Sequence, residues 1–432
     1  MSFPRKRESR IRLLDPCLAG RQAGSRLGMT DTPMSLFSKF KKVEKLSPQL
    51  RNLYLHQVIK NIGLEVIGIF GAIFLYQITG SLAAVLWIFL IVSFFYFLLL
   101  PLWAKLLRLI NLHILMSIGT VLLLVNVIIF YFLSPGVSSW PQIFLLGFLI
   151  LAEVAHRLFY WVPYHVDLAR FIDTHHRGRQ LSALAILVSV IGIALPAFSA
   201  FIIVRFGFPV LFILASCLIL MSVFPIFFIR SGREFFSFRY AETFTKLFDR
   251  KHFKSNLAYF ANGFQNAVSQ IVWPIFIFLI LEGRYLKVGL LSATIILVVC
   301  ILRYAVGEAT DRLDKKKLIR AGSILYAIGW LFKAVASATA SIFLAGFYHD
   351  FTSVIVYTPF DALMYEIAAD QGHYVYEFTI LREMSLHVGR VVALALGLLI
   401  VYNFGINYVF IAAAAVSLLL SLVSKEEFIS IR

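Results

Sequence analysis

Residues that could handle protons or bind a polar solute recur at helical spacing inside long apolar stretches. The largest set shares one helix face at intervals of three or four residues: Glu153, Arg157, Tyr160, Tyr164 and Asp167, with His156 beside them. A carboxylate and a histidine in such a place can exchange protons or hold a solute, while an arginine adjusts the proton affinity of the carboxylate. The alternative is a Glu153–Arg157 pair that only holds its helix against a neighbour.

Two further stretches carry side-chain amides at intervals of four residues. The first has Gln57, Asn61 and Glu65, with Lys60 alongside, and the second has Asn262, Asn266 and Gln270. Trp273-Pro274 follows the second set and predicts a kink there. Matching stripes on two helices suggest a shared polar cavity, and hydrogen bonds that merely hold the bundle together are the alternative.

Two later stretches add charges of both signs. They contain His349, Asp350, Tyr357, Asp361 and Tyr365, and then Arg382, Glu383, His387 and Arg390. Asp350, Asp361 and Glu383 are further candidates for carrying a proton, and Arg390 is a candidate for binding an anionic group. Arg382 and Glu383 could instead form a gate pair or reach the interface, and Lys333 is expected to reach the interface.

The composition requires a membrane environment for these polar groups. The chain has 432 residues, of which 60% are hydrophobic and only 15% are charged. A soluble domain could not cover so much apolar surface, so we predict a polytopic membrane protein. The net charge of +17 resides in short loops, which sets membrane orientation and gives no reason to expect nucleic-acid binding. The three cysteines have no metal-binding spacing, no nucleotide-binding loop is present, and no cofactor is predicted.

A membrane span needs about 20 apolar residues. Twelve segments meet this requirement: 53–78, 82–104, 112–134, 140–167, 181–204, 207–229, 256–281, 286–306, 318–336, 341–366, 376–402 and 405–423. The predicted organisation is a basic N-terminal segment (1–50), a six-helix bundle (51–229), a linker (230–254), a second six-helix bundle (255–424) and a tail (425–432). Within the linker, the spacing of Tyr240, Phe244, Leu247 and Phe248 predicts a helix that lies along the membrane surface.

Basic residues also predict the orientation. With both termini in the cytoplasm, Arg205, Arg284 and Lys287 are the basic residues that fall in loops on the outer side. We therefore expect a multi-pass protein of the inner (plasma) membrane. Residues 1–33 are rich in arginine without an apolar core, so they do not form a signal peptide. They resemble translated repeats found before bacterial reading frames, and we expect the native start at Met29 or Met34.

The two predicted bundles carry similar sequences. Ile73-Phe-Leu75 matches Ile277-Phe-Leu279, and Phe206-Gly207 matches Phe404-Gly405. With an even number of spans in each copy, the two repeats must share one orientation in the membrane.

The segment Gly307–Lys317, expected as a short basic turn, carries a glycine, an aspartate four residues later, an arginine and a lysine run. This pattern resembles the loop signature of the major facilitator superfamily of transporters, and the likeness in organisation extends over nearly everything after residue 50. The resemblance implies an all-α fold of twelve transmembrane helices in two parallel-repeat bundles. Gly307, Asp311, Arg312 and the matching Arg108 would have gating roles, joined by Arg382 and Glu383. The first-half copy of the loop lacks the glycine and the aspartate, which places its gating role in doubt.

The resemblance further implies secondary transport of a small solute by alternating access, with the first helix of each three-helix unit lining the cavity. We expect a monomer with protons as coupling ion, Glu153 as first proton carrier and Asp361 as second. Amphipathic or zwitterionic solutes fit the mixed polar groups. A lipid flippase or a non-transporting sensor on the same fold remains open, as does a multi-span membrane enzyme, although the chain offers no large loop for catalytic residues.

Overall fold

The computed structural model describes residues 47–172, 192–233, 235–250, 252–312, 314–371 and 374–423, with the side chains of residues 106, 107, 301–312 and 369 outside the description. The chain divides into Met1–Leu46 and Ser47–Arg432, and the described residues all belong to the second unit. Its described residues form helices and no strand.

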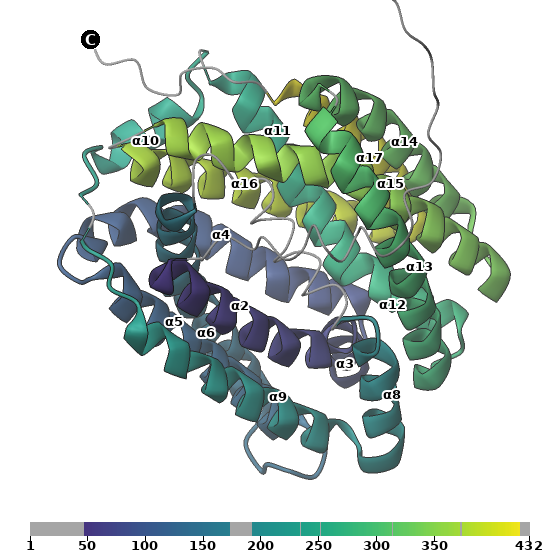
Figure 1. Cartoon of the computed structure of the whole chain (residues 1–432). Coiled ribbons are helices and arrows are strands. Elements are labelled where there is room, and N and C mark those ends of the chain that lie inside the picture. The colour runs from purple at the N-terminus through teal and green to yellow at the C-terminus, as the bar shows by residue number, and fades with distance from the viewer. Residues whose placement is uncertain are drawn as a thin grey trace, which may run out of the picture. The chain divides into compact units, whose positions relative to one another are not determined.

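The first half of the unit is a bundle of helices that pack mainly on one another. Its elements are α2 (Pro48–Ile67), α3 (Phe70–Thr79), α4 (Leu82–Leu107), α5 (Leu112–Leu133), α6 (Gln142–Phe171), α8 (Leu195–Phe206), α9 (Phe208–Val223) and the short η1 (Phe224–Phe228). Helix α5 packs against α6 and α9, and α9 also packs against α2 (Figure 1).

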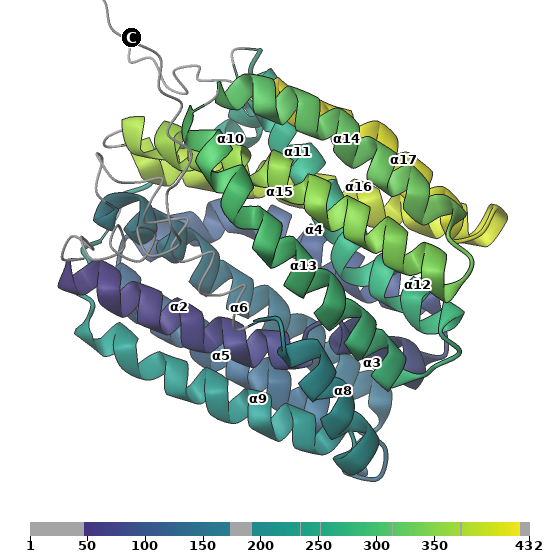
Figure 2. The same cartoon turned by 45° about the vertical axis from the view of Figure 1, so that its right-hand side comes forward.

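The second half repeats this pattern after the linker helix α10 (Tyr240–Leu247). Its elements are α11 (Phe253–Ala267), η2 (Val268–Val272), α12 (Trp273–Ile280), α13 (Tyr285–Arg312), α14 (Lys315–Val335), α15 (Thr339–Asp370), α16 (Val375–Asn403), α17 (Asn407–Ser417) and η4 (Leu418–Leu422). The two halves meet where α4 packs on α16 and where α8 packs on α13 (Figures 1 and 2).

These helices correspond to the predicted spans. Nine helical stretches of the described chain are long and apolar enough to cross a membrane, and three shorter apolar helices begin at Leu195, Tyr285 and Asn407. Together they match the twelve predicted segments, although the fifth, 181–204, is described only from residue 192. The protein is therefore a multi-pass membrane protein.

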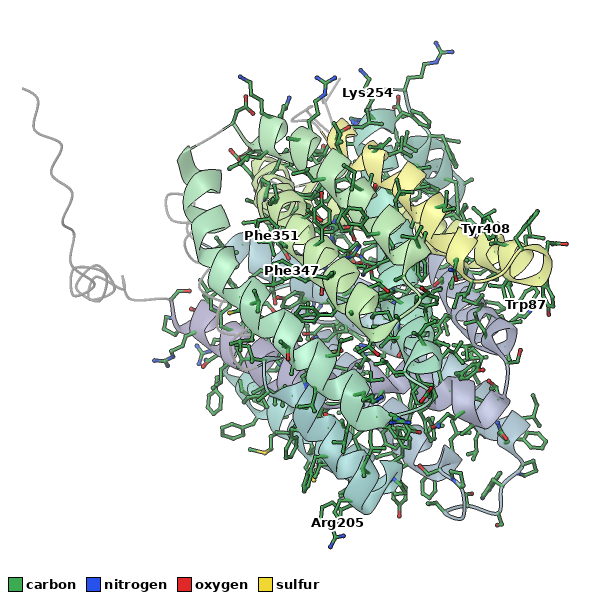
Figure 3. The ribbon with its side chains drawn as sticks, turned by 90° about the vertical axis from the view of Figure 1, so that its right-hand side faces the viewer. Trp87, Arg205, Lys254, Phe347, Phe351 and Tyr408 are labelled. Carbon is green, nitrogen blue, oxygen red and sulfur yellow. The ribbon has the colours of Figure 1, made fainter. Side chains whose placement is uncertain are left out.

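Large apolar side chains cover the outside of the helices. Trp87, Phe351 and Tyr408 lie along the sides of the molecule, whereas Arg205 and Lys254 lie at its opposite ends (Figure 3). In water this surface would be unstable, but in a bilayer it is the favourable one, because the helices satisfy their own backbone hydrogen bonds. We refer below to the Arg205 end and the Lys254 end of the molecule.

The predicted kink at Trp273-Pro274 is present as a π-helical turn. Val268–Val272 forms this turn directly before α12, in which Pro274 lies in the first turn. Proline has no N–H to donate and its ring clashes with the carbonyl four residues earlier, so the regular ladder cannot continue.

Helices α11 and α16 approach very closely because each has a glycine at the contact. A Cβ atom on Gly263 would lie 1.8 Å from the carbonyl oxygen of Leu386, and one on Gly389 would lie 1.9 Å from that of Phe260. Small residues allow such backbone contact between membrane helices. This contact fixes α16, which carries several of the charged candidates.

The segment Gly307–Lys317 differs from the expected short turn. Helix α13 continues to Arg312 and α14 begins at Lys315, so most of the segment is helical. Asp314 caps α14 by accepting hydrogen bonds from the backbone N–H groups of Lys316 and Lys317 (2.8 and 3.4 Å). A capped helix start needs only a short connection, which is why the turn is shorter than predicted.

A helix is present in the linker, as predicted, and it contacts protein. Its Tyr240 hydroxyl donates to the Leu98 carbonyl of α4 (3.3 Å), and Phe244 packs edge-on against Phe97. Just before α10, the Ser237 hydroxyl donates to Glu377 of α16 (2.9 Å). The linker is thereby attached to one helix of each half.

Candidate functional site

The predicted pair on α6 is formed. An Arg157 guanidinium nitrogen lies 2.6 Å from Glu153 Oε1, and the two side chains are 14% and 18% exposed. Both residues lie close to the midpoint of α6 and thus far from either end of the span. His156 is buried beside them, with its Nδ1 2.7 Å from the Gly119 carbonyl oxygen of α5.

One turn farther along α6, Tyr160 joins this helix to α2. Its hydroxyl donates to Gln57 Oε1 (2.9 Å) and lies 2.9 Å from His56 Nε2. The other ring nitrogen of His56 lies 2.7 Å from the Ser222 carbonyl oxygen of α9. Three helices of the first half are thus connected through one buried tyrosine and one buried histidine.

Lys60 lies next to this contact in a cage of aromatic rings. Its side chain is completely buried, and its Nζ is 4.0, 4.9 and 5.9 Å from the ring centres of Tyr160, Trp161 and Tyr164. In the described chain Nζ has no hydrogen-bond acceptor. A cation–π contact contributes about 0.5–2 kcal/mol, whereas burying an ion costs several kcal/mol. The rings therefore offset only part of the cost of this charge.

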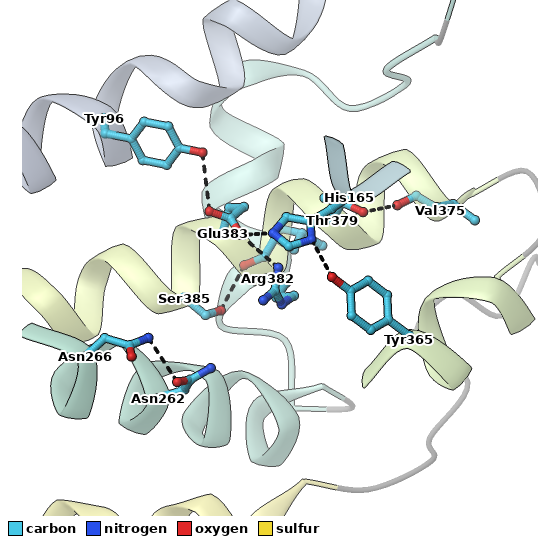
Figure 4. A network of polar contacts seen from close by, with 11 residues as sticks. Tyr96, His165, Asn262, Asn266, Tyr365, Val375, Thr379, Arg382, Glu383 and Ser385 are labelled. Atoms are coloured by element: carbon cyan, nitrogen blue, oxygen red, sulfur yellow. Dashed lines mark hydrogen bonds and ion pairs between the residues drawn. The ribbon is translucent and has the colours of Figure 1, made fainter. Parts of the chain in front are cut away.

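Glu383 of α16 is the centre of a network between the two halves (Figure 4). It accepts a hydrogen bond from Arg382 (2.8 Å) and a longer one from Tyr96 of α4 (3.4 Å). His165 of α6 lies 3.7 Å from Glu383 and also contacts the Tyr365 hydroxyl of α15 (3.0 Å). The predicted Arg382–Glu383 pair therefore exists, and it is buried rather than extended to an interface.

Arg390 and His387 lie on the same helix, closer to its midpoint. His387 is buried, and its ring lies 4.1 Å from the ring of Tyr96. Arg390 is partly buried, and it interacts electrostatically with Arg157, Glu153 and Glu383. The charges predicted on α6 and on α16 thus influence one another across the boundary between the halves.

The expectation for Lys333 is wrong. This lysine is 1% exposed, its Nζ lies 2.9 Å from His349 Nδ1, and it sits over the rings of Trp273 and Trp330. Its Nζ also lies 3.9 Å from a carboxylate oxygen of Asp350, so this predicted proton carrier is next to a buried cation. Because α14 and α15 meet closely here, the side chain has partners within the protein and does not need to reach the interface.

The remaining predicted residues are less closely connected. Asn266 donates to Asn262 (3.1 Å), and the described chain contains no hydrogen bond from this pair to the stripe of α2. Tyr164 stacks on Tyr160, and Tyr357 lies edge-on to Tyr326. The other members vary in exposure: Asn61 is partly buried, and Glu65, Gln270 and Asp361 are exposed.

The loop candidates give less information. Gly307, Asp311 and Arg312 lie in the last turns of α13, and their side chains are outside the described part of the chain. Arg108 directly follows α4 and is exposed.

Sequence reasoning missed Tyr96 and His165, which connect the halves through Glu383 and Tyr365. Tyr96 is an isolated polar group in an apolar span, and His165 is off the main polar face of α6. Only a polar side chain inside an apolar segment could have signalled them, because their partners come from other helices.

Comparisons with known proteins agree with this architecture. A family model described as the Major Facilitator Superfamily matches residues 255–425. In sequence, the chain matches no curated protein.

Two solved structures are similar over most of the chain. A bacterial homologue of the iron transporter ferroportin, in an outward-facing state, has a TM-score of 0.63 at 18% identity, and the match covers 86% of this chain and 98% of that one. The human organic anion transporter MFSD10 (TETRAN) has a TM-score of 0.62 at 14% identity, covering 87% and 98%. At these identities the likeness shows the fold alone.

The fold is thus that of helical membrane transporters with two bundles in parallel repeat. In its second half, residues 255–425, the chain is similar in sequence to the Major Facilitator Superfamily.

Proposed function

We propose that this protein is a secondary transporter that moves a small solute across the inner membrane by alternating access, with protons as the coupling ion. Both termini would be cytoplasmic, so the Lys254 end would face the cytoplasm. Residues 51–229 and 255–424 would be the two moving bundles, in a protein that works as a monomer.

The observation that carries this proposal is the position of the charged groups. Glu153 and Arg157 from the first half and Arg390 from the second lie near the midpoints of their helices and interact with one another. A charge at the centre of a bilayer costs about 2.5–3.5 kcal/mol on insertion scales, so such residues generally have a function. A junction between two repeats near the midplane is where transporters of this kind bind their solutes.

Contacts between the halves flank this junction on both sides. Toward the Arg205 end, the Tyr285 hydroxyl of α13 donates to Gln77 of α3. Toward the Lys254 end, the Tyr376 hydroxyl of α16 donates to the Ala104 carbonyl oxygen of α4 (3.3 Å). Breaking one set of contacts while the other persists would expose the junction to one side of the membrane at a time.

Proton coupling would use a carboxylate near the junction. Glu153 is our first candidate because it is bound to Arg157 and also interacts with Arg390, and neighbouring cations that respond to the solute can change its affinity for a proton. Asp361 is the second candidate.

Uptake by proteoliposomes tests the proposal. A panel of labelled solutes would be offered to vesicles with and without an imposed pH gradient. Accumulation that depends on the gradient supports proton-coupled transport. Accumulation only with a sodium gradient would overturn the choice of ion, and movement of fluorescent lipid in place of any solute would favour a flippase.

A further inference from the structure

We propose that the transported solute is an anion, and that its acidic group binds between Arg157 of α6 and Arg390 of α16. This inference rests on the proposed function and specifies its substrate class. The recognised chemistry is an oxyanion: a carboxylate, a sulfonate or a phosphate.

The first observation is that Arg390 has no ion-pair partner in the described chain. Its Nε is buried without a hydrogen-bond acceptor, although a guanidinium offers five donors in a planar fork that matches an oxyanion. The carboxylates with which it interacts already have closer cations: Glu153 is bound to Arg157, and Glu383 is bound to Arg382.

The second observation is the excess of positive charge around this point. The cations are Arg157, Arg382 and Arg390, with Lys60 acting on the neighbouring His156, and the carboxylates that face them are Glu153 and Glu383, with Asp361 acting on Arg382. Lys60 and Arg390 are the cations of this group without a bound carboxylate in the described residues. Buried ions are normally paired, so a missing negative charge is best explained by a ligand that supplies it.

The third observation is that the pair is accessible. Arg157 and Glu153 are 14% and 18% exposed although they lie near the middle of α6, and Arg390 is also partly exposed. Both arginines are therefore partly exposed as residues, although Arg390 Nε itself is buried, whereas Lys60 is fully buried and lies over the ring of Tyr160.

Buried rings pack around the pair. His156 stacks on Tyr160, and His387 lies against Tyr96. These rings keep the surroundings of the two guanidinium groups largely free of water, where a charge-assisted hydrogen bond to an anion is strong.

A ligand series with one body and different charged groups tests this inference. The purified protein in detergent would be titrated with benzoate, benzenesulfonate and phenyl phosphate, and with benzamide and benzylamine as neutral and cationic counterparts. The shift in Tm and the change in tryptophan fluorescence report binding, which needs no transport. A second arm adds phosphatidylglycerol or phosphatidylcholine to distinguish a soluble anion from a lipid headgroup.

We expect stabilisation by the anions and none by benzamide or benzylamine. Stabilisation by phosphatidylglycerol, without stabilisation by the soluble anions or by phosphatidylcholine, would mean that the site binds the phosphate of a lipid headgroup. If benzamide or benzylamine stabilised as well as benzoate, or if no anion bound up to the millimolar range, the inference would be overturned. Counterflow in proteoliposomes then tests transport separately: binding of anions without exchange contradicts the proposed function and leaves the anion site intact.

Variants assign the binding to the named residues. Arg390→Gln should lower the affinity for the bound anion by about tenfold or more, because a charge-assisted pair of hydrogen bonds is lost. Arg390→Lys should retain part of the affinity. Arg284→Gln is the control, since Arg284 pairs with Glu282 in an exposed turn (3.0 Å). Equal affinity in Arg390→Gln and in the control would place the anion elsewhere.

Lys60→Met separates a role in binding from a role in folding. Removing an unpaired buried charge should lower the affinity for the anion, whereas the Tm of the protein without ligand should not fall. A lower Tm with unchanged affinity would remove Lys60 from the site.

Discussion

Charged side chains near the junction differ in whether they have a partner. Glu153 and Arg157 are bound to each other, and so are Arg382 and Glu383, while Lys60 and Arg390 have no bound carboxylate in the described chain. Pairs of the first kind keep a charge in place, whereas cations of the second kind are able to respond to a ligand or a proton. The two kinds of residue should therefore behave differently when substituted.

Glu153→Gln should abolish the coupling of transport to protons, while exchange of the solute across the membrane continues. We expect pH-driven accumulation to fall by about tenfold or more, because an amide cannot carry the proton. Counterflow without a gradient should persist. The measurement is accumulation by proteoliposomes with and without a pH gradient, compared with Asp361→Asn. Unchanged pH-driven accumulation in both variants would contradict proton coupling at these residues.

Glu383→Gln should destabilise the protein. Arg382 would lose its bound carboxylate, and removing one partner of a buried pair costs about 3–5 kcal/mol. Tyr96→Phe is the matched comparison, because the 3.4 Å bond that it removes is long and should contribute little. The measurement is Tm of the purified variants in detergent. A Tm for Glu383→Gln as high as that for Tyr96→Phe would show that the buried Arg382–Glu383 pair does not stabilise the protein.

Helical spacing was sufficient to predict the residues that share a face of α6 and the bond between Glu153 and Arg157. It could not predict that Tyr160 binds Gln57, or that His165 meets Tyr365, because these contacts depend on how the helices pack. Lys333 illustrates the same limit: its place near a helix end suggested the interface, but the neighbouring α15 provides His349 and Asp350 as partners.

Among the helices, α11 and α16 form the closest contact described above, with glycine on both sides. Side chains on α16 reach α4 and α6 of the first half, so the position of α16 determines which groups meet at the junction. Displacing it from α11 would change the network around Glu383.

Gly389→Ala should test this contact. The added methyl group would overlap the Phe260 carbonyl, and overpacking costs about 1–3 kcal/mol or more. Gly147→Ala is the control, since a Cβ atom there meets nothing within 4 Å. We expect the Tm of Gly389→Ala to fall below that of the unsubstituted protein and the Tm of Gly147→Ala to stay unchanged. Equal Tm values for the two variants would mean that α11 and α16 can separate at no cost.

Apolar length predicted the helices, and Trp273-Pro274 predicted an irregularity where the structure has a π-helical turn, because both follow from local chemistry. The end of α13 was not predicted. Polar residues and a glycine at 307–312 suggested a turn, but the helix continues and Asp314 begins the next one. Tertiary packing commonly overrides such weak local preferences.

At the scale of the whole molecule, contacts between the halves occur toward both ends. Tyr285 bonds to Gln77 toward the Arg205 end, and His165 bonds to Tyr365 toward the Lys254 end. Alternating access requires that each of these contacts opens in turn. A covalent link between the halves at either end should therefore stop transport, whereas a link between two positions of the same half should leave transport intact.

Cross-linking of cysteine pairs measures this directly. In a variant with Cys17, Cys217 and Cys300 replaced by serine, one pair would join positions 77 and 285 and another positions 165 and 365. The control pair would join positions 78 and 142, where Gln142 donates to the Ile78 carbonyl oxygen within the first half (2.9 Å). Because these positions are joined through the ends of long side chains, a reducible bifunctional thiol reagent would bridge each pair. Counterflow of the same solute would be measured before and after cross-linking, and again after reduction.

We expect cross-linking to stop counterflow in both pairs that join the halves, reduction to restore it, and the control pair to remain active throughout. Undiminished counterflow with either end cross-linked would contradict alternating access between the two bundles.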